Sequence, residues 1–385
     1  MGRGARPAMV IAVVASAAAC AVSTAAASAT RPVRIAVEGP MTGAEASTGL
    51  DMLRGAQLAT ARLNARGGVL GRRVELVAGD DRADPATGAK VARRLVRSGV
   101  NAVIGPFNSA VGLQTLPIYR AAGLPILRLT SATATEGFGV TTQPMVTQIA
   151  PVEQAELISV LHAHSVAVLY DPSTYTAAIA SQLASALRAA GVSVPVEAVL
   201  DPTAGEGPVA QALQRTAAAR PDVTYLAMYG PQAGAIAARM AATPRAYGRC
   251  FVDLAAQGPS FVSAAGAAAS GCLSSGVPSD DQLPGGKPYT RAYRKRFNIS
   301  PGTWGAFTYD SLNMLAAAVR RSHRWKGSKL RNVLQHTRGF RGVTGETTVL
   351  PASGNRADPP VVILDINPAG RYVVDHAWAS FAGYF

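Results

Sequence analysis

Short apolar runs alternate with longer amphipathic segments from residue 33 onward. The runs predict strands at 33–38, 73–79, 101–105 and 124–129, and the segments between them predict helices at about 49–65, 85–98 and 109–122. In the first helix, apolar residues recur every three or four positions and so lie on one face, as expected for a helix packed on a core. These residues are Met52, Ala56, Ala59 and Leu63. The run 102–104 is apolar throughout, as in a strand covered on both faces. Repeated strand–helix units of this kind predict a doubly wound parallel sheet.

The same alternation begins again after about residue 150. Strands are expected at 165–170, 193–200, 222–229, 249–254 and 272–276, and helices near 152–163, 174–190, 206–219 and 231–242. Three further helices are expected at about 287–297, 303–322 and 327–336, followed by strands at 346–350, 361–366 and 371–374. The order predicts an α/β protein with two lobes, each built on its own sheet.

The first 29 residues have the pattern of a secretory signal peptide. Arg3 and Arg6 give a positive start, and residues 10–19 form an apolar run too short to span a bilayer comfortably. Ala27-Ser28-Ala29 then fits a small-residue cleavage site. We therefore expect export to the cell envelope or beyond, and the alternatives are a disordered leader or a membrane anchor.

Cys20 adds a second possibility to this leader. It follows Ala17-Ala18-Ala19 at the end of the apolar run, a position that resembles a bacterial lipoprotein acylation site. Ala17 stands where such sites usually have a large aliphatic residue. Cys20 is a candidate for lipidation, which would anchor the protein to the outer face of the cytoplasmic membrane, and otherwise it leaves with the leader.

Composition narrows the classes of function. With 385 residues and 48% apolar residues, the chain is long enough for two domains with buried cores. The formal net charge is +14, yet the Lys and Arg residues are scattered over predicted helix faces rather than gathered with aromatic residues. We therefore expect no nucleic-acid partner, although the charge could favour an anionic envelope.

Two cysteines remain after the leader, Cys250 and Cys272. An exported chain can keep a disulfide, and the two cysteines start consecutive predicted strands that can lie side by side. The alternative is a pair of buried thiols. Neither cysteine has a His or a second Cys at metal-ligand spacing, so no metal site is expected.

The sequence contains no recognisable catalytic or cofactor motif. It has no nucleophile elbow of the G-x-S-x-G type, no Walker phosphate loop and no H-E-x-x-H helix. His162 and His164 are two residues apart and do not share a helix face. We therefore expect neither an enzyme nor a bound cofactor, and the enzyme alternative is a hydrolase of unfamiliar type.

Small polar residues gather where predicted strands end, which is where open α/β sheets bind ligands. The candidates in the first lobe lie in the loops 105–109 and 130–133, and they are Asn108, Ser109, Ser131, Ala132 and Thr133. Those in the second lobe lie at or after the ends of the strands expected at 165–170, 222–229 and 249–254, and they are Tyr175, Tyr229 and Asp253. Hydroxyls and backbone amides at a helix N-terminus suit an anion. The same Ser and Asn residues could simply cap helices, the tyrosines could pack in the core, and Asp253 could lie in a surface turn.

Three segments carry a family resemblance. In the first, Gly67-Gly68 ends a helix, a turn at Gly71 leads into a strand, and Asp80-Asp81 and Asp84-Pro85 follow. The others are the segments 304–310, WGAFTYD, and 340–345, FRGVTG. Their order and spacing over residues 33–374 resemble the extracellular solute-binding proteins of the leucine/isoleucine/valine-binding family.

This resemblance implies a type I periplasmic binding fold, in which two lobes are joined by a hinge that the chain crosses three times. The crossings would lie near 149–151, 277–281 and 344–350, so that residues 30–149 with 281–345 form lobe 1 and residues 150–280 with 346–385 form lobe 2. The family packs the segment 304–310 mostly between helices.

The resemblance also implies roles for the candidate residues. Ser109, Ser131 and Thr133 would hold a ligand carboxylate with a backbone group of Ala132, while Tyr175 and Tyr229 face the cleft and Asp253 meets the ligand ammonium. Two positions depart from the family pattern: Thr48 stands where amino-acid binders often have an aromatic residue, and Thr176 replaces a glycine.

The function expected from these observations is capture of a small amino-acid-like or carboxylate metabolite by hinge closure. The captured ligand would be delivered to the membrane permease of an ABC importer. A ligand-sensing receptor subunit that signals to a membrane partner is the alternative. A family member that no longer binds ligand is a further possibility, because of Thr48 and Thr176.

Overall fold

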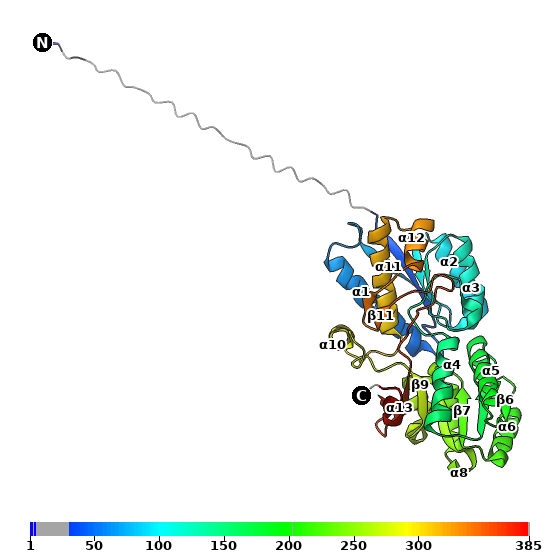
Figure 1. Cartoon of the computed structure of the whole chain (residues 1–385). Helices are drawn as coiled ribbons and strands as arrows, with labels where there is room; N and C mark the ends of the chain where they lie inside the picture. Colours follow the sequence, from blue (N-terminus) through cyan, green and yellow to red (C-terminus); the bar gives the residue numbers. More distant parts are fainter. Residues whose placement is uncertain (3, 5–30, 202, 384–385) are drawn as a thin grey trace.

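The structure is a computed structural model and describes residues 1–2, 4, 31–201 and 203–383. It consists of two lobes, one above the other in Figure 1, and each lobe is built on its own sheet. The expected signal peptide, with Ala27-Ser28-Ala29 and the lipidation candidate Cys20, lies outside the described residues.

The first sheet has four parallel strands in the order β2-β1-β3-β4. Its strands are β1 (Val33–Gly39), β2 (Val74–Asp80), β3 (Ala102–Ile104) and β4 (Ile126–Leu127). The helices of this lobe are α1 (Ala46–Ala65), α2 (Pro85–Arg97), α3 (Ser109–Ala121), α11 (Gly305–Ser322) and α12 (Ser328–Gln335). Helix α10 (Gly286–Phe297) contacts α1 from the side.

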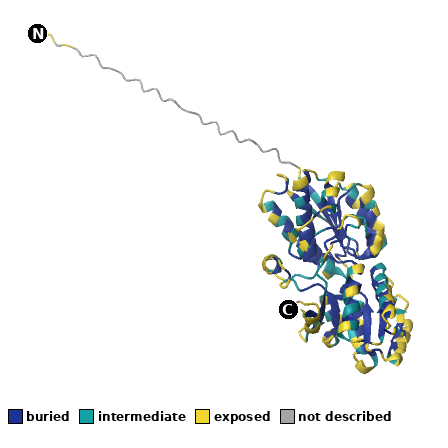
Figure 2. Ribbon diagram, viewed as in Figure 1, coloured by how far each residue is buried: buried dark blue, intermediate teal, exposed yellow. Residues whose placement is uncertain are grey.

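Alternate residues of β1 face opposite helix layers, as the pleat of a strand requires. Ile35 belongs to the core under α1 and α11, whereas Ala36 packs with Leu95 of α2 and Leu116 of α3. Both residues are fully buried, and most of β1 and all of β3 are buried. Figure 2 shows the strands inside each lobe mainly in dark blue. The predicted doubly wound arrangement is therefore confirmed for this lobe.

Paired glycines end α1, as the sequence predicts. Gly67 and Gly68 have φ angles of 83° and 80°, which an L-residue adopts only at a steric cost. Glycine also lets α1 and α11 approach closely. A Cβ on Gly55 would lie 2.0 Å from the carbonyl oxygen of Gly305, so a larger residue at position 55 would force the two helices apart.

The second sheet has seven strands in the order β13-β12-β9-β8-β7-β5-β6. Its strands are β5 (Val166–Tyr170), β6 (Glu197–Val199), β7 (Val223–Ala227), β8 (Arg249–Val252), β9 (Leu273–Gly276), β12 (Val362–Ile366) and β13 (Tyr372–Val374). Strands β5 to β9 are parallel, but β12 runs antiparallel to β9, and β13 antiparallel to β12. The sheet is thus parallel with an antiparallel edge.

Helices cover both faces of this sheet. One face carries α4 (Val146–Ala155) and α5 (Thr174–Ala189), and the other carries α6 (Glu206–Ala219), α7 (Gly230–Met240) and α9 (Pro259–Ala265). Val168 faces the first layer and Leu169 the second. Two short helices, α8 (Pro244–Tyr247) and α13 (His376–Phe381), complete the lobe.

Several element boundaries differ from the sequence predictions. Strand β4 has only two residues, because the backbone of Arg128 bonds to Val140 and that of Leu129 bonds to Pro106 beyond the sheet ladder. Strand β6 is shorter than 193–200, since Pro195 lacks the N–H that a ladder needs. The helix expected at 152–163 begins earlier, at Val146, and passes into a π-helical turn, η2 (Glu156–Val160).

The chain passes between the sheets three times: after β4, after β9, and after a hairpin of β10 (Phe340–Gly342) and β11 (Gly345–Thr347). Buried arginines tie the first and third passages together. Arg128 Nη2 donates to Asn355 Oδ1, and Arg356 Nη1 donates to the carbonyl of Thr142 at 3.1 Å. The lobe limits given by the resemblance remain a proposal.

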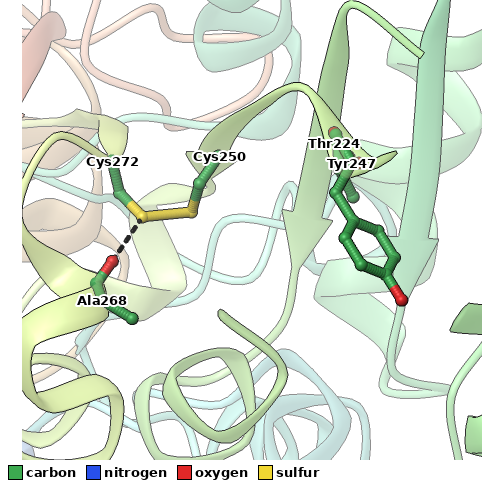
Figure 3. The surroundings of a disulfide bond; sticks show 5 residues. All are labelled: Thr224, Tyr247, Cys250, Ala268 and Cys272. Carbon is green, nitrogen blue, oxygen red and sulfur yellow. Dashed lines mark hydrogen bonds between the residues drawn. A yellow bond between two sulfur atoms is a disulfide. The ribbon is translucent and has the colours of Figure 1, made fainter. Parts of the chain in front are cut away.

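A disulfide joins two neighbouring strands of the second sheet. Cys250 lies in β8, Cys272 directly precedes β9, and the Cα atoms of the pair are 4.7 Å apart. Figure 3 shows the bond beside Ala268, whose carbonyl oxygen lies 3.3 Å from Cys272 Sγ. The side-by-side strands that the sequence predicts bring the two sulfurs together.

Candidate functional site

A small cavity lies between the lobes, beyond the carboxyl ends of several strands. Its volume is about 20 Å³, room for about one water molecule. One wall, called the lobe 1 wall, is formed by six residues: Phe107, Ser109, Leu129, Ser131, Gln143 and Trp304, the last of which directly precedes α11. The opposite wall, called the lobe 2 wall, is formed by Tyr175, Tyr229, Leu254 and Ala255.

The cavity continues outward along the boundary between the lobes. A neighbouring hollow of about 240 Å³ shares Tyr229, Ala255 and Trp304 with it and is also lined by Glu45 and Thr48. A larger groove of about 740 Å³ lies farther along, around α10 and α9. We place the candidate site at the small cavity, because it alone of the three is lined by both loops that follow β3 and β4.

Ser109 supplies a hydrogen-bond donor on the lobe 1 wall. It is the first residue of α3, and its Oγ accepts a bond of 3.2 Å from the backbone N–H of Ala132. Among the described residues, no acceptor takes the proton of this hydroxyl. Its neighbour Asn108 instead points to Glu45, with Nδ2 donating to the carboxylate at 3.0 Å. Burial raises the pKa of Glu45 to about 7.

The hydroxyl of Ser131 is already committed. Its single proton is donated to the carbonyl of Pro144 at 2.7 Å, so its oxygen must accept from the amide of Gln143, at 2.8 Å. This fixes the orientation of the Gln143 amide, with Nε2 toward Ser131 and Oε1 as its acceptor. Gln143 is 1% exposed, and Oε1 has no hydrogen-bond partner within the described part of the chain.

An acidic group lies behind the lobe 2 wall. Tyr175 OH donates to Asp253 Oδ2 at 2.8 Å, and Asp253 Oδ1 accepts from the backbone N–H of Ala255 at 2.7 Å. Asp253 is fully buried, and burial raises its pKa to about 7. Thr176, which stands where the family has glycine, donates to Asp171 Oδ1 at 2.7 Å and so holds the loop before Tyr175.

Aromatic rings form the apolar part of the site. The ring of Phe107 lies 5.1 Å from that of Trp304 and 6.4 Å from that of Tyr229, centroid to centroid. Asp51 of α1 fixes the segment that carries Trp304, because its buried carboxylate accepts from the backbone N–H groups of Gly302, Trp304 and Gly305 at 2.6–3.0 Å. Trp304 therefore lies at the cavity, whereas the resemblance assigns its segment mostly to packing between helices.

The predicted site residues fall into three groups. Ser109, Ser131, Tyr175 and Tyr229 line the cavity. Asn108, Ala132 and Asp253 lie directly behind them and hold them by hydrogen bonds or charge. Thr133 is exposed at the start of the short helix η1 (Thr133–Thr135) and is outside the cavity lining.

Sequence reasoning missed six of the lining residues: Phe107, Leu129, Gln143, Leu254, Ala255 and Trp304. Phe107 lies in the loop 105–109 that was singled out, and its position beside Ser109 could have identified it. Gln143 carries no local signal, since its role depends on the hydrogen bonds of Ser131, twelve residues earlier.

The described residues also limit what else the site and the helices can do. No group of three or more His, Cys, Asp or Glu side chains there is placed to hold a metal ion. None of the helices in that part combines the length and the apolar character needed to cross a bilayer.

Comparison with known proteins agrees with this architecture. A family model described as periplasmic binding protein matches residues 32–371. The amino acid binding protein of Pseudomonas aeruginosa is 30% identical over 310 residues, which cover 74% of this chain and 78% of the relative. The Leu/Ile/Val-binding protein of Escherichia coli is 28% identical over 300 residues, covering 75% of this chain and 80% of the relative.

A solved structure gives the same result for the fold. The branched-chain amino acid transporter substrate binding protein LivJ from Streptococcus pneumoniae, in complex with isoleucine, superimposes with a TM-score of 0.78 at 24% sequence identity. The match covers 89% of this chain and 97% of that protein. This chain is therefore a member of the periplasmic binding protein family, a solute-binding protein rather than an enzyme.

Proposed function

We propose that this protein captures a hydrophobic α-amino acid between its lobes and delivers it to the membrane permease of an ABC importer. The observation that carries the proposal is the order of groups around the cavity. An uncommitted hydroxyl lies on one wall at Ser109, aromatic rings surround the middle, and the pair Tyr175–Asp253 lies on the other wall. These are the groups that a carboxylate, an apolar side chain and an ammonium would need.

The carboxylate end is assigned to Ser109. Its hydroxyl can donate to an anion and begins a helix, where the backbone dipole also favours negative charge. Each hydrogen bond to a charged group contributes about 1.5–3 kcal/mol, so three or four of them, less the ordering costs, can reach the roughly −8 kcal/mol of micromolar affinity. We do not assign Ser131 a donor role, because its proton is used by Pro144.

The ammonium end is assigned to Tyr175 and Asp253. A cation near a buried carboxyl favours the ionised form of that carboxyl, and the attraction is strong where water is excluded. A simple carboxylic acid has no ammonium to place beside Asp253, so it would leave this acidic group without a cation. The acidic wall therefore supports an amino acid as ligand over a carboxylate without an ammonium.

Ligand entry requires the lobes to part. Cavities that hold small molecules usually measure about 300–1,000 Å³, far above the 20 Å³ found here. Because Trp304 and Phe107 come from one wall and Tyr229 from the other, separating the walls would enlarge the cavity without unfolding either lobe. A ligand that contacts both walls would then shift the population toward the closed form.

The location and the transport partner also belong to this proposal. Family membership supports an extracytoplasmic protein. Cleavage after the leader, or a lipid on Cys20, is proposed from sequence alone, and mass spectrometry of protein from the cell envelope would distinguish the two.

A thermal-shift panel of amino acids and short carboxylates tests the proposed function. We expect at least one hydrophobic amino acid to raise the melting midpoint of the wild-type protein. Ser109→Ala and Tyr175→Ala should each reduce that rise, because each removes a group of the cavity wall. Thr133→Ala is the matched control, since its exposed hydroxyl lies outside the lining and the variant should respond like the wild type. If no amino acid raises the midpoint, the proposal is wrong.

A further inference from the structure

A second buried carboxyl lies behind the lobe 2 wall. Glu153, in α4, is fully buried, and its Oε1 accepts from Tyr225 OH at 2.9 Å and from Ser275 Oγ at 2.6 Å. Its Oε2 has no hydrogen-bond partner among the described residues. The strand register brings the two carboxyls near each other. Val252 of β8 pairs with Ser274 of β9, so Asp253 lies beside Ser275, and Ser275 donates to Glu153. Helix α5 brings Tyr175 to Asp253, and β7 brings Tyr225 to Glu153.

The surroundings of this pair favour its protonated form. Burial raises the pKa of Glu153 to about 8, and the neighbouring charge of Asp253 raises it further in the same direction. The titratable groups that interact electrostatically with Glu153 and Asp253 come from the neighbouring elements of lobe 2, and all of them are acidic or phenolic. They are Tyr175, Tyr225, Tyr229 and Asp171. Strand β12, which also packs against α4, brings the apolar Val362 and Leu364 and the half-buried Asp365.

Two carboxyls in one apolar site rarely ionise together, because the second negative charge would lie buried beside the first. The hydrogen bonds are consistent with a retained proton. Tyr175, Tyr225 and Ser275 each donate to one oxygen of the pair, while Glu153 Oε2, which receives none, is a suitable place for a carboxyl hydrogen.

We propose that Glu153 is a positioning residue of the ligand site that shares a proton with Asp253, and that an ammonium-bearing ligand displaces this proton into solvent. The inference rests on the proposed function. The step balances at the carboxyl pair: the ligand ammonium brings one positive charge to it, the pair loses one proton to solvent, and the charge around the pair is unchanged. The ligand carboxylate is held separately, at Ser109. No bond other than that O–H is broken.

Selectivity follows from this exchange. Isoleucine can replace the proton, whereas 3-methylpentanoate, which has the same side chain and carboxylate without the ammonium, cannot. Affinity for isoleucine should therefore rise with pH, by up to about tenfold per pH unit for one proton. The rise should end at the pH where the pair is already deprotonated in the ligand-free protein. Affinity for 3-methylpentanoate should not rise over the same range.

Isothermal titration calorimetry in phosphate and in Tris, which differ in ionisation enthalpy, measures the protons exchanged on binding. At pH 7 we expect the full-length mature protein to release between about 0.5 and 1 proton per isoleucine bound. Glu153→Gln keeps an acceptor for Tyr225 and Ser275 but removes the shared proton. This variant should release less than half as many protons per isoleucine as the wild type. Its affinity for isoleucine should also depend less on pH between 6 and 8.5.

Glu156→Gln is the matched control. Glu156 follows α4 in η2 and is fully buried, and burial raises its pKa to about 7, but its charged neighbours are Asp375 and Arg249 rather than the ligand wall. This variant should release as many protons per isoleucine as the wild type.

The possible outcomes separate the two proposals. If isoleucine binds and Glu153→Gln releases as many protons as the wild type, the role of Glu153 is overturned and the proposed function stands. If 3-methylpentanoate binds and no amino acid does, both are overturned. Proton release that falls below half of the wild-type value in Glu153→Gln and persists in Glu156→Gln supports both.

Discussion

Hydroxyl groups of the same type differ in what they can do at this site. Ser109 and Ser131 both line the cavity. Ser109 lies at the end of the loop that follows β3, and Ser131 lies in the loop that follows β4. Ser131 has given its proton to Pro144, whereas Ser109 only accepts from Ala132. A serine donates one hydrogen bond, so its partner within the protein decides whether it can serve a ligand.

Gln143 provides a test at the scale of one residue. We expect Gln143→Met to lower affinity for the ligand by about tenfold, because the change removes the Oε1 acceptor and leaves Ser131 without its donor, at a cost of about 1–2 kcal/mol. Titration calorimetry with isoleucine measures the effect.

The control for this variant is Gln335→Met. Gln335 also uses its amide in a single bond, to the carbonyl of Pro351 at 2.7 Å, but it lies at the surface. It should change affinity by less than twofold. Equal affinity of Gln143→Met and the wild type would show that the Gln143 amide does not contribute to the ligand site.

At the scale of elements, the disulfide links β8 to β9 at one end of the second sheet. The two strands also pair through Phe251 and Leu273, so the bond reinforces a contact that the sheet already makes. The bond closes a loop with a sequence separation of 22 residues that contains η3 (Leu254–Ala256), α9 and η4 (Gly266–Ala269). Asp253 and Ala255 of the ligand wall lie in that loop.

Removing the disulfide should lower stability by about 3 kcal/mol, because a loop of this length gains conformational freedom in the unfolded chain. The measurement is urea unfolding of Cys250→Ala/Cys272→Ala against the wild type. A reducing agent should destabilise the wild type by a similar amount and leave the double variant unchanged. Equal unfolding midpoints of the wild type with and without reducing agent would contradict the prediction.

Whether a segment forms a helix or a strand was predictable from local patterns, but some of the residues at which these elements begin and end were not. The alternation of apolar runs and amphipathic segments identifies β1 to β9 and most helices, because burial on one face or both leaves its period in the sequence. The two-residue β4 and the π-helical turn after α4 have no such signature. After β4 the backbone bonds to Pro106 and Val140, and η2 contacts α13 near the end of the chain, so both depend on residues that are distant in the sequence.

At the scale of the whole molecule, buried acids should make stability depend on pH. Burial raises the pKa of Glu45, Asp81, Asp253 and Glu156 to about 7, and that of Glu153 to about 8. In the unfolded chain these groups ionise near pH 4. Between about pH 4 and pH 8 the unfolded state therefore binds fewer protons than the folded state, and stability falls as pH rises.

We expect the melting midpoint of the ligand-free protein to be higher at pH 5.5 than at pH 8.5. Calorimetric scans across this range measure it. Isoleucine should reduce the difference, because an ammonium beside Asp253 stabilises the ionised pair. A midpoint that increases steadily with pH would show that these carboxyls ionise at ordinary pH despite their burial.

The sequence by itself determined the two α/β lobes, the family and the loops at the strand ends, because periodicity and turn residues are local and survive in a linear reading. The tertiary structure alone decided which side chains of those loops meet. Trp304 is placed by Asp51, about 250 residues away, and Glu153 reaches Ser275, the neighbour of Asp253, only when α4 packs on the second sheet. Hydrogen-bond partners and burial are properties of distances in space, so no local pattern records which hydroxyl keeps its proton or which carboxyl holds one.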